Sequence, residues 1–154
     1  MATVYSVQKT KWNQNVPSEM VKTNEQGGRI RVAHGVYAAS SLASGDVIEM
    51  FNIPNGARLL EGSLAHDALG ASTTLSVGYA AHTDSNGSAV SAAAAAYKAA
   101  AASTSAQKVD VLATLALGSG TEVDADENGL PVTVTMGGAA GTGDIELTIK
   151  YVVD

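Results

Sequence analysis

The sequence predicts an all-β fold, an antiparallel β-sandwich of the jelly-roll kind, and three observations support this. Several stretches alternate apolar and polar residues with the period of two that marks a half-buried strand. Turn signals rich in glycine, asparagine and aspartate separate these stretches. The strands follow one another without the long helices that βαβ units require. We therefore expect about seven strands, or eight if residues 3–8 also pair.

The clearest strand signal lies at the end of the sequence. In DIELTIKYVVD, alternate residues are apolar and would share one face of an extended chain: Ile145, Leu147, Ile149, Tyr151 and Val153. The same alternation recurs in three other segments: 29–38, 71–79 and 132–136. Segments 46–53 and 109–117 are apolar on both faces, which is typical of inner strands.

One segment departs from the strand pattern. Residues 88–105 read SAVSAAAAAYKAAAASTS, and alanine is the best helix former because it loses no side-chain entropy on folding. The composition predicts a helix over about 88–105, inserted between two strands and packed on the sandwich surface or at a subunit contact. A membrane-spanning helix is disfavoured because alanine is weakly apolar and Lys98 lies near the middle.

Length and composition limit the class of protein. A chain of 154 residues without cysteine is expected to form one domain with neither disulfides nor thiolate-bound metal. No run of about 20 strongly apolar residues occurs, and the first residues lack the apolar core of a signal peptide. We therefore expect a soluble protein that is made in the cytosol and does not bind membranes.

The charges are distributed unevenly along the chain. Residues 1–31 carry five basic and two acidic residues, a net charge of +3. Because the whole chain carries −6, the remaining residues carry −9. This predicts an extended basic N-terminal arm, residues 1–28, on an acidic β-sandwich domain, residues 29–154. The alternative is a solvated segment whose charges bind nothing. Nucleic-acid binding is not expected, because the arm lacks a dense basic cluster and the body would repel phosphates.

The motif DADENG, residues 124–129, resembles the first half of a calcium loop. Its candidate ligands are Asp124, Asp126 and Asn128. The second half of the loop is missing, because Thr135 stands where a bidentate glutamate is needed and Pro131 follows closely. The motif is therefore expected to be an acidic hairpin tip, and these three residues are only weak metal candidates.

Catalytic patterns are not evident. The histidines at positions 34, 66 and 82 show no ligand spacing, no nucleophile elbow of the G-x-S-x-G kind occurs, and no glycine-rich segment leads into a helix and lysine as a phosphate loop does. The sequence thus favours a non-enzymatic protein without a cofactor, whose surface serves binding or assembly.

Two segments resemble small virion proteins of tailed bacteriophages, especially capsid decoration or cement proteins. In DVIEMFNIPNGARLLEGSLAHDALGASTTLSVGY, residues 46–79, an apolar strand ends in a Pro-x-Gly-Ala turn, and an ALG turn then leads to a T-L-x-V-G-Y strand. The closing GTGDIELTIKYVVD, residues 141–154, is similar to the final strand of such proteins. Together the two segments cover about a third of the chain.

The resemblance implies a structural protein on the exterior of the virion, synthesised in the bacterial cytoplasm. Its partners would be the major capsid protein and further copies of itself, as a dimer or trimer. The arm residues expected to contact the capsid are Lys9, Lys11, Trp12, Lys22 and Arg29, with Trp12 as the apolar anchor. Alternatively, Trp12 packs on its own domain.

Other functions stay open at this point. The chain also suits a phage tail component or a receptor- or carbohydrate-binding β-module, which would need an exposed aromatic platform. A calcium-dependent enzyme or sensor would rest on DADENG alone.

Overall fold

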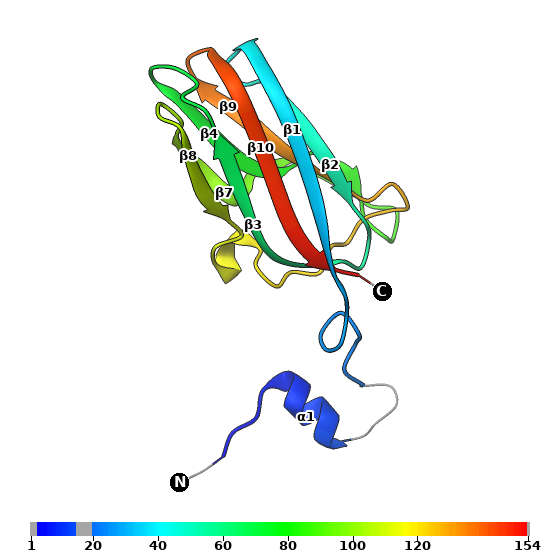
Figure 1. The fold of residues 1–154 in the computed structure, drawn as a ribbon. Helices are drawn as coiled ribbons and strands as arrows, with labels where there is room; N and C mark the ends of the chain where they lie inside the picture. The colour runs from blue at the N-terminus through cyan, green and yellow to red at the C-terminus, as the bar shows by residue number, and fades with distance from the viewer. Residues whose placement is uncertain (1–2, 15–19, 154) are drawn as a thin grey trace.

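Two four-stranded antiparallel sheets pack face to face in the computed structural model, which describes residues 3–14 and 20–153 (Figure 1). The β1 sheet has the strand order β1 (Ile30–Leu42), β10 (Gly141–Val152), β3 (Arg58–His66) and β8 (Gln107–Val111). The β2 sheet has the order β2 (Val47–Ile53), β9 (Leu130–Gly138), β4 (Thr73–Tyr79) and β7 (Ala93–Ala102).

The connections between strands make this sandwich a jelly roll. The chain passes from one sheet to the other between β1, β2, β3 and β4, runs on to β7 beside β4, and then alternates again through β8, β9 and β10. Eight antiparallel strands connected in this way form the double-sheet jelly roll. The predicted fold class is thereby confirmed. A separate two-stranded hairpin is formed by β5 (His82–Thr83) and β6 (Ala89–Val90).

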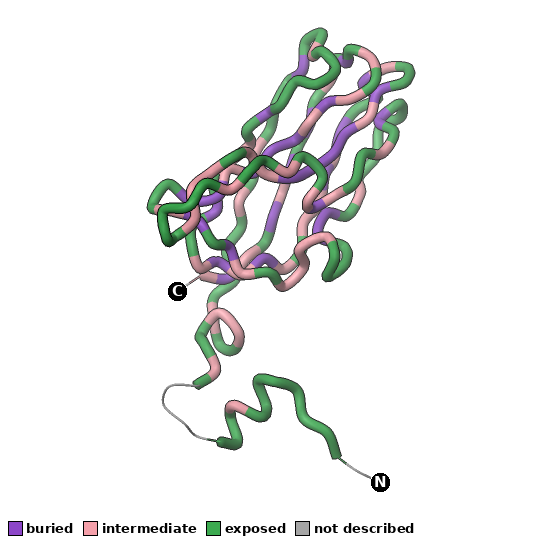
Figure 2. Tube along the Cα trace, turned by 180° about the vertical axis from the view of Figure 1, so that it is seen from behind, coloured by how far each residue is buried: buried purple, intermediate pink, exposed green. Residues whose placement is uncertain are grey.

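The core lies between the sheets, where Figure 2 shows most of the buried chain. β10 contributes Ile145, Leu147 and Ile149, all fully buried, as its alternation predicted. β4 adds Leu75 and Val77 from the facing sheet. Aliphatic side chains therefore supply most of the buried volume, and each contributes about 1.5–3 kcal/mol of transfer free energy.

The predicted alanine helix is wrong. Residues 93–102 form strand β7, which pairs with β4 at the edge of the β2 sheet, and Tyr97 in its middle is buried. Helix propensity differs by less than about 1 kcal/mol per residue among ordinary residues. A strand that satisfies its backbone groups on β4 and buries an aromatic ring outweighs that preference.

The two segments predicted as inner strands also differ from expectation. Both β2 and β8 lie at sheet edges. Strand β8 ends at Val111. Leu112 then takes a positive φ of 60°, and residues Leu115–Leu117 form a short 3₁₀ helix. Residues of these apolar runs, among them Ile48, Ile53 and Val111, are buried in the core although their strands lie at sheet edges.

The N-terminal segment is not fully extended. Residues 3–8 do not pair as a strand, and helix α1 (Val7–Gln14) lies below the sandwich in Figure 1. No helix in residues 3–14 or 20–153 is long and apolar enough to cross a membrane.

Candidate functional site

Helix α1 begins at a serine cap. The Ser6 hydroxyl accepts a hydrogen bond from the Lys9 N–H at 3.2 Å, and the Ser6 carbonyl accepts one from the Thr10 N–H at 2.9 Å. Such a cap stabilises a helix by about 1 kcal/mol. The helix buries none of its residues, so packing adds little and its position depends on polar contacts with the following segment.

Glu25 makes those polar contacts. Its carboxylate accepts hydrogen bonds from the Gln8 side chain and the Lys22 N–H, each at 3.2 Å, and lies 3.8 Å from Lys11 Nζ and 3.9 Å from Arg58. The hydrogen bond from Gln8, then that from Lys22, and the two nearby cations lower the pKa of this carboxyl group. Glu25 thus ties α1 to the sandwich through a single side chain.

Arg58 and Glu122 hold the arm from the sandwich side. Arg58, at the start of β3, donates to the Gly120 carbonyl at 2.6 Å and to the Glu122 carboxylate at 3.2 Å. Glu122 in turn binds Lys22 Nζ at 3.0 Å. Lys11, Glu25, Arg58, Glu122 and Lys22 therefore alternate in sign through one ionic cluster.

Backbone contacts place the last part of the arm. The Asn24 amide donates to the Gly56 carbonyl at 3.0 Å. Gly28 lies so close to the sandwich that a Cβ on it would approach Val152 Cγ1 to 2.3 Å and the Thr23 carbonyl oxygen to 2.7 Å. The chain therefore enters β1 along a fixed path.

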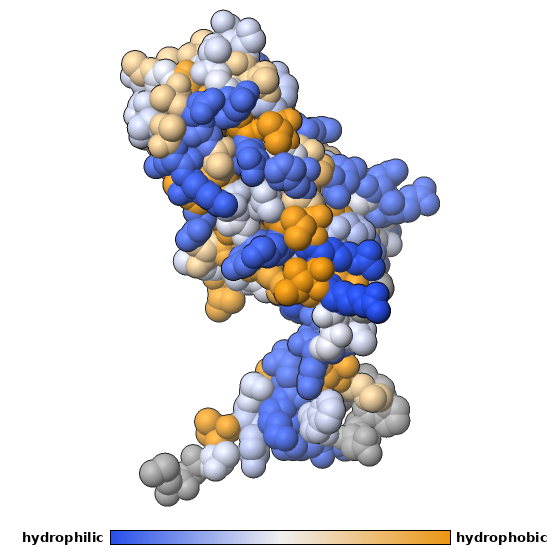
Figure 3. Space-filling view, in the orientation of Figure 1, coloured by the Kyte–Doolittle hydropathy of each residue, from blue (hydrophilic) through white to orange (hydrophobic). Residues whose placement is uncertain are grey.

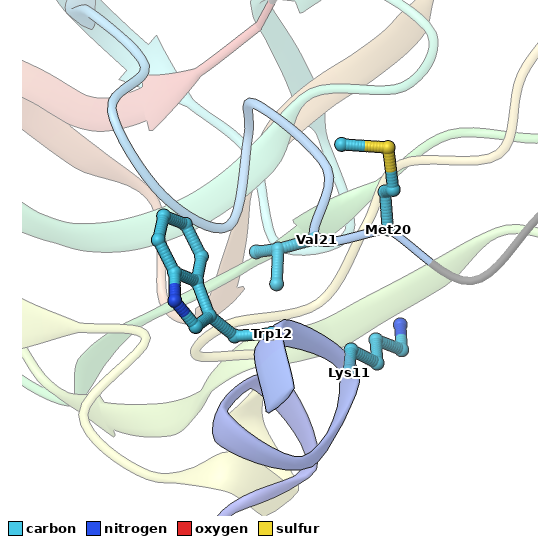
Figure 4. A pocket seen from close by; sticks show the side chains of 4 residues that line it. All are labelled: Lys11, Trp12, Met20 and Val21. Carbon is cyan, nitrogen blue, oxygen red and sulfur yellow. The ribbon is translucent and has the colours of Figure 1, made fainter. Parts of the chain in front are cut away.

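An apolar hollow lies on the arm, and we call it the arm cradle. It measures about 370 Å³ and is lined by Lys11, Trp12, Met20 and Val21. Figure 4 shows these four side chains around the space. Trp12 is 63% exposed and Met20 64% exposed. Large apolar side chains that are this exposed commonly mark a surface that meets a partner.

The predicted arm residues fall into two groups. Lys11 and Lys22 already have carboxylate partners in Glu25 and Glu122. Lys9 and Arg29 are exposed, and the described part of the chain gives neither an ion pair. Trp12 lines two hollows together with other arm residues and is itself mostly exposed.

The residues of DADENG make hydrogen bonds within their own loop and to the neighbouring Ser85. Asp126 accepts hydrogen bonds from the Asn128 N–H at 2.8 Å and side chain at 3.2 Å, and closes a turn with Gly129. Asp124 accepts from the Ser85 N–H at 2.9 Å, and hydrogen bonding by Ser85 lowers the pKa of Asp124. Within residues 3–14 and 20–153 no three potential metal ligands cluster.

The three histidines lie in different places. His34 is near Thr148 and Glu146 on the outside of the β1 sheet, His66 bonds to the Asp67 carbonyl, and His82 bonds to the Ala80 carbonyl.

A second exposed apolar surface was not recognised from the sequence. Ile30, Val32 and Val36 on β1 are 64%, 57% and 60% exposed. The alternation that predicted this strand is present, but its apolar face points outward. In Figure 3, orange patches follow the line of β1 among hydrophilic neighbours. We call these three residues the β1 stripe. They are exposed because they point away from the core on the outer face of the β1 sheet, and the alternation alone does not show which face that is.

The same fold occurs in the capsids of three bacteriophages. In the capsid asymmetric unit of cyanophage Pam1, a chain is 21% identical with a TM-score of 0.60 over 82% of this chain and 86% of its own length. A chain in the capsid of Ralstonia phage GP4 is 23% identical with a TM-score of 0.62, over 82% of this chain and 86% of its own length. A chain in the acid-stable capsid of Helicobacter pylori phage KHP30 is 15% identical with a TM-score of 0.53, over 80% of this chain and 87% of its own length.

These similarities confirm the resemblance to phage capsid proteins at the level of the fold. No protein-family model matches the sequence, and no curated protein is similar to it in sequence.

Proposed function

We propose that this chain is a structural protein of a tailed-phage virion that binds the outer surface of the capsid and stabilises it, as a decoration or cement protein does. The observation that carries the proposal is the jelly-roll fold shared with chains of three phage capsids over about four fifths of its length. The role is mechanical, not enzymatic: a rigid sandwich covers the shell, and an arm reaches the neighbouring capsid subunits.

The arm has the features that such a contact needs. The arm cradle offers Trp12 and Met20 as apolar anchors, Lys9 lines a neighbouring hollow with Trp12, and Arg29 adds a further exposed positive charge at the end of the arm. Aromatic and basic residues dominate the binding energy of many interfaces. The ionic cluster around Glu25 holds the arm in place before binding, which lowers the entropy lost when the complex forms. Capsid contact through this arm is therefore the specific form of the proposal.

Reconstitution on phage heads tests this proposal. Heads assembled without the protein are mixed with the full chain, with a variant lacking residues 1–26, or with Trp12→Ala, and bound protein is measured by co-sedimentation. We expect the deletion to abolish binding and Trp12→Ala to weaken it about 30-fold, the effect of a hot-spot residue.

Leu115→Ala is the matched control, because Leu115 is an apolar residue that is 85% exposed on the sandwich and far from the arm in sequence. It should bind as the unaltered chain does. Undiminished head binding by the deletion variant would disprove the role of the arm, while no binding by the full chain would disprove the decoration function.

The copy number in purified particles separates this function from its main alternative. A decoration protein should approach the copy number of the major capsid protein in quantitative mass spectrometry, whereas a tail component would be present in far fewer copies. A carbohydrate-binding module would instead give specific signals on a glycan array. The sandwich offers little support for that module, since Tyr37 is its most exposed aromatic residue at 38%.

A further inference from the structure

The four sheet edges are protected to different degrees. Edge strands expose unpaired N–H and C=O groups, and proteins normally blunt them with bulges, charges or short length. β8 has five residues, β2 has seven and a register shift between Glu49 and Phe51, and β7 has two register shifts against β4. β1 has 13 residues and pairs regularly with β10 from Ile30 to Ala39. It is the long and regular edge of the molecule.

The side chains on β1 add to this lack of protection. Outward lie the β1 stripe residues with His34 among them, and toward the other sheet lie Arg31 and Tyr37, both exposed. Gly35 between them packs so closely on β2 that a Cβ would lie 3.0 Å from the Met50 carbonyl oxygen. An exposed edge that is long and apolar is a template for pairing with another strand.

We propose that the free edge of β1 pairs antiparallel with β1 of a second copy of this chain, about a twofold axis at His34. The two four-stranded β1 sheets then become one continuous sheet across the dimer. The inference does not depend on the proposed capsid function, since it concerns only how two copies associate.

The residues opposite one another in this register are complementary. On the outer face, Val32 lies opposite the second copy's Val36, and the reverse pair repeats by symmetry. On the inner face, Arg31 lies opposite the second copy's Tyr37, which suits a guanidinium over an aromatic ring. The small residues Ala33 and Gly35 face each other in the same way. Apolar and cation–aromatic cross-strand pairs each stabilise a sheet.

The charges beside the β1 stripe also match. In the register of the β1 sheet, Lys150 lies next to Val32 and Glu146 lies next to Val36. In each row across the twofold axis, a lysine and a glutamate would therefore flank the two valines at a separation of about 14 Å, three strand spacings. A twofold interface uses the same patch on both copies and so requires this self-complementarity. It favours a second copy over an unrelated protein as the occupant.

The antiparallel arrangement also determines where the arms lie. Because each arm enters β1 at Ile30, the twofold axis places the two arms at opposite ends of the joined sheet. Both arm cradles stay uncovered in the dimer.

Analytical ultracentrifugation of the full chain tests the interface. We expect a dimer, and Val36→Lys should raise the dimer dissociation constant about 10-fold or more, because each interface would lose both Val32–Val36 pairs and place a lysine opposite each Val32. Val47→Lys on the edge strand β2 is the matched control, since Val47 is 56% exposed and lies outside the interface. It should dimerise as the unaltered chain does, and both variants should keep its melting temperature under conditions where the chain is monomeric.

Cysteine cross-linking tests the register directly, because the chain contains no cysteine. Residues facing each other in an antiparallel pair have Cα atoms about 4.5–5.5 Å apart, which suits a disulfide. His34→Cys should therefore form an interchain disulfide under mild oxidation. Val32→Cys should not, because the two copies of residue 32 would lie about 13 Å apart, four residues along the strand.

Several results would overturn the inference. These are a chain that stays monomeric up to its solubility limit, an oligomer of another order, a dimer that survives Val36→Lys, or cross-linking at residue 32 in preference to residue 34. Protection of β1 by a capsid protein in place of a second copy would count equally against it.

Discussion

β1 and β7 are both edge strands with unpaired backbone groups, but they differ in how well they are protected against pairing with a further strand. β1 is regular, rich in β-branched residues, and exposes its apolar side chains. β7 is rich in alanine, shifts its register twice against β4, and points small side chains to the solvent. Bulges and small residues discourage a further strand from adding to an edge. The difference shows that an edge strand is protected by its geometry as much as by its charges.

The bulged course of β7 depends on two anchors. Gly78 on β4 leaves room for the β7 backbone, since a Cβ there would lie 1.8 Å from the Ala93 carbonyl oxygen. Tyr97 points its ring into the core and packs against Tyr79, with ring centroids 5.8 Å apart. β1 buries no aromatic ring, and its long regular ladder with β10 holds it along its length.

The largest expected effect follows from removing the aromatic anchor of β7. Tyr97→Ala should lower the free energy of unfolding by about 3–5 kcal/mol, the cost of deleting a large buried ring. Urea denaturation followed by far-UV circular dichroism measures this. Tyr97→Phe is the control and should stay within about 1 kcal/mol, because the described residues give the Tyr97 hydroxyl no hydrogen bond. Equal losses in the two variants would contradict the anchoring role of the ring.

A smaller loss is expected where β7 crosses Gly78. Gly78→Ala should cost about 2–3 kcal/mol of unfolding free energy, because the backbone of β7 must move away. Gly87→Ala is a useful comparison, since Gly87 has a φ of 85° with open space around it and should cost only about 1 kcal/mol of backbone strain. A smaller loss of unfolding free energy for Gly78→Ala than for Gly87→Ala would contradict the close packing of β7 on Gly78.

A still smaller effect is expected at the arm that leads into β1. Because the pKa of Glu25 is lowered in the folded chain from 4.5, its stabilising contribution is complete above pH 4.5 and is lost as the pH falls through the lowered value. In NMR titrations the Gln8 side-chain amide and the Lys22 N–H should shift together, with a midpoint below pH 4.5. Glu25→Gln should abolish this shared transition, and separate midpoints would contradict the network.

The smallest effect concerns the local preference of the β7 segment. A peptide of residues 88–105 should be partly helical by circular dichroism in water with added trifluoroethanol, because its alanines favour a helix once tertiary pairing is absent. A control peptide with glycine at three of the alanine positions should lose that helicity. A peptide that forms strands under these conditions would show that the segment prefers β structure by itself.

Much of the fold follows from local patterns that the sequence carries. The alternation at Ile145, Leu147 and Ile149 predicts both the strand and its buried face, because β10 is paired on both sides and lies over the core. Turn residues separate the strands well enough to indicate a sandwich. Periodicity alone is sufficient wherever a strand has one face toward the core and neighbours on both sides.

The remaining features depend on contacts between distant segments. β7 is a strand because it pairs with β4 and packs closely on Gly78, and Val32 is exposed because it lies on the outer face of its sheet. Both facts depend on contacts between distant segments. The candidate surfaces show the same division. Trp12 was named as a candidate from its residue type, whereas the pairing of Lys22 with Glu122, 100 positions away, depends on how the arm meets the sandwich.

The location of the single tryptophan affects how this protein is best studied. Trp12 is the sole indole of the chain, and it lies on α1, outside the sandwich. Intrinsic fluorescence excited at the indole band will therefore report on the arm, its mobility and its quenching, and will be nearly silent about melting of the β core. An unfolding curve recorded by this fluorescence would measure detachment of the arm from the sandwich. A low midpoint could therefore be recorded while the jelly roll is still folded.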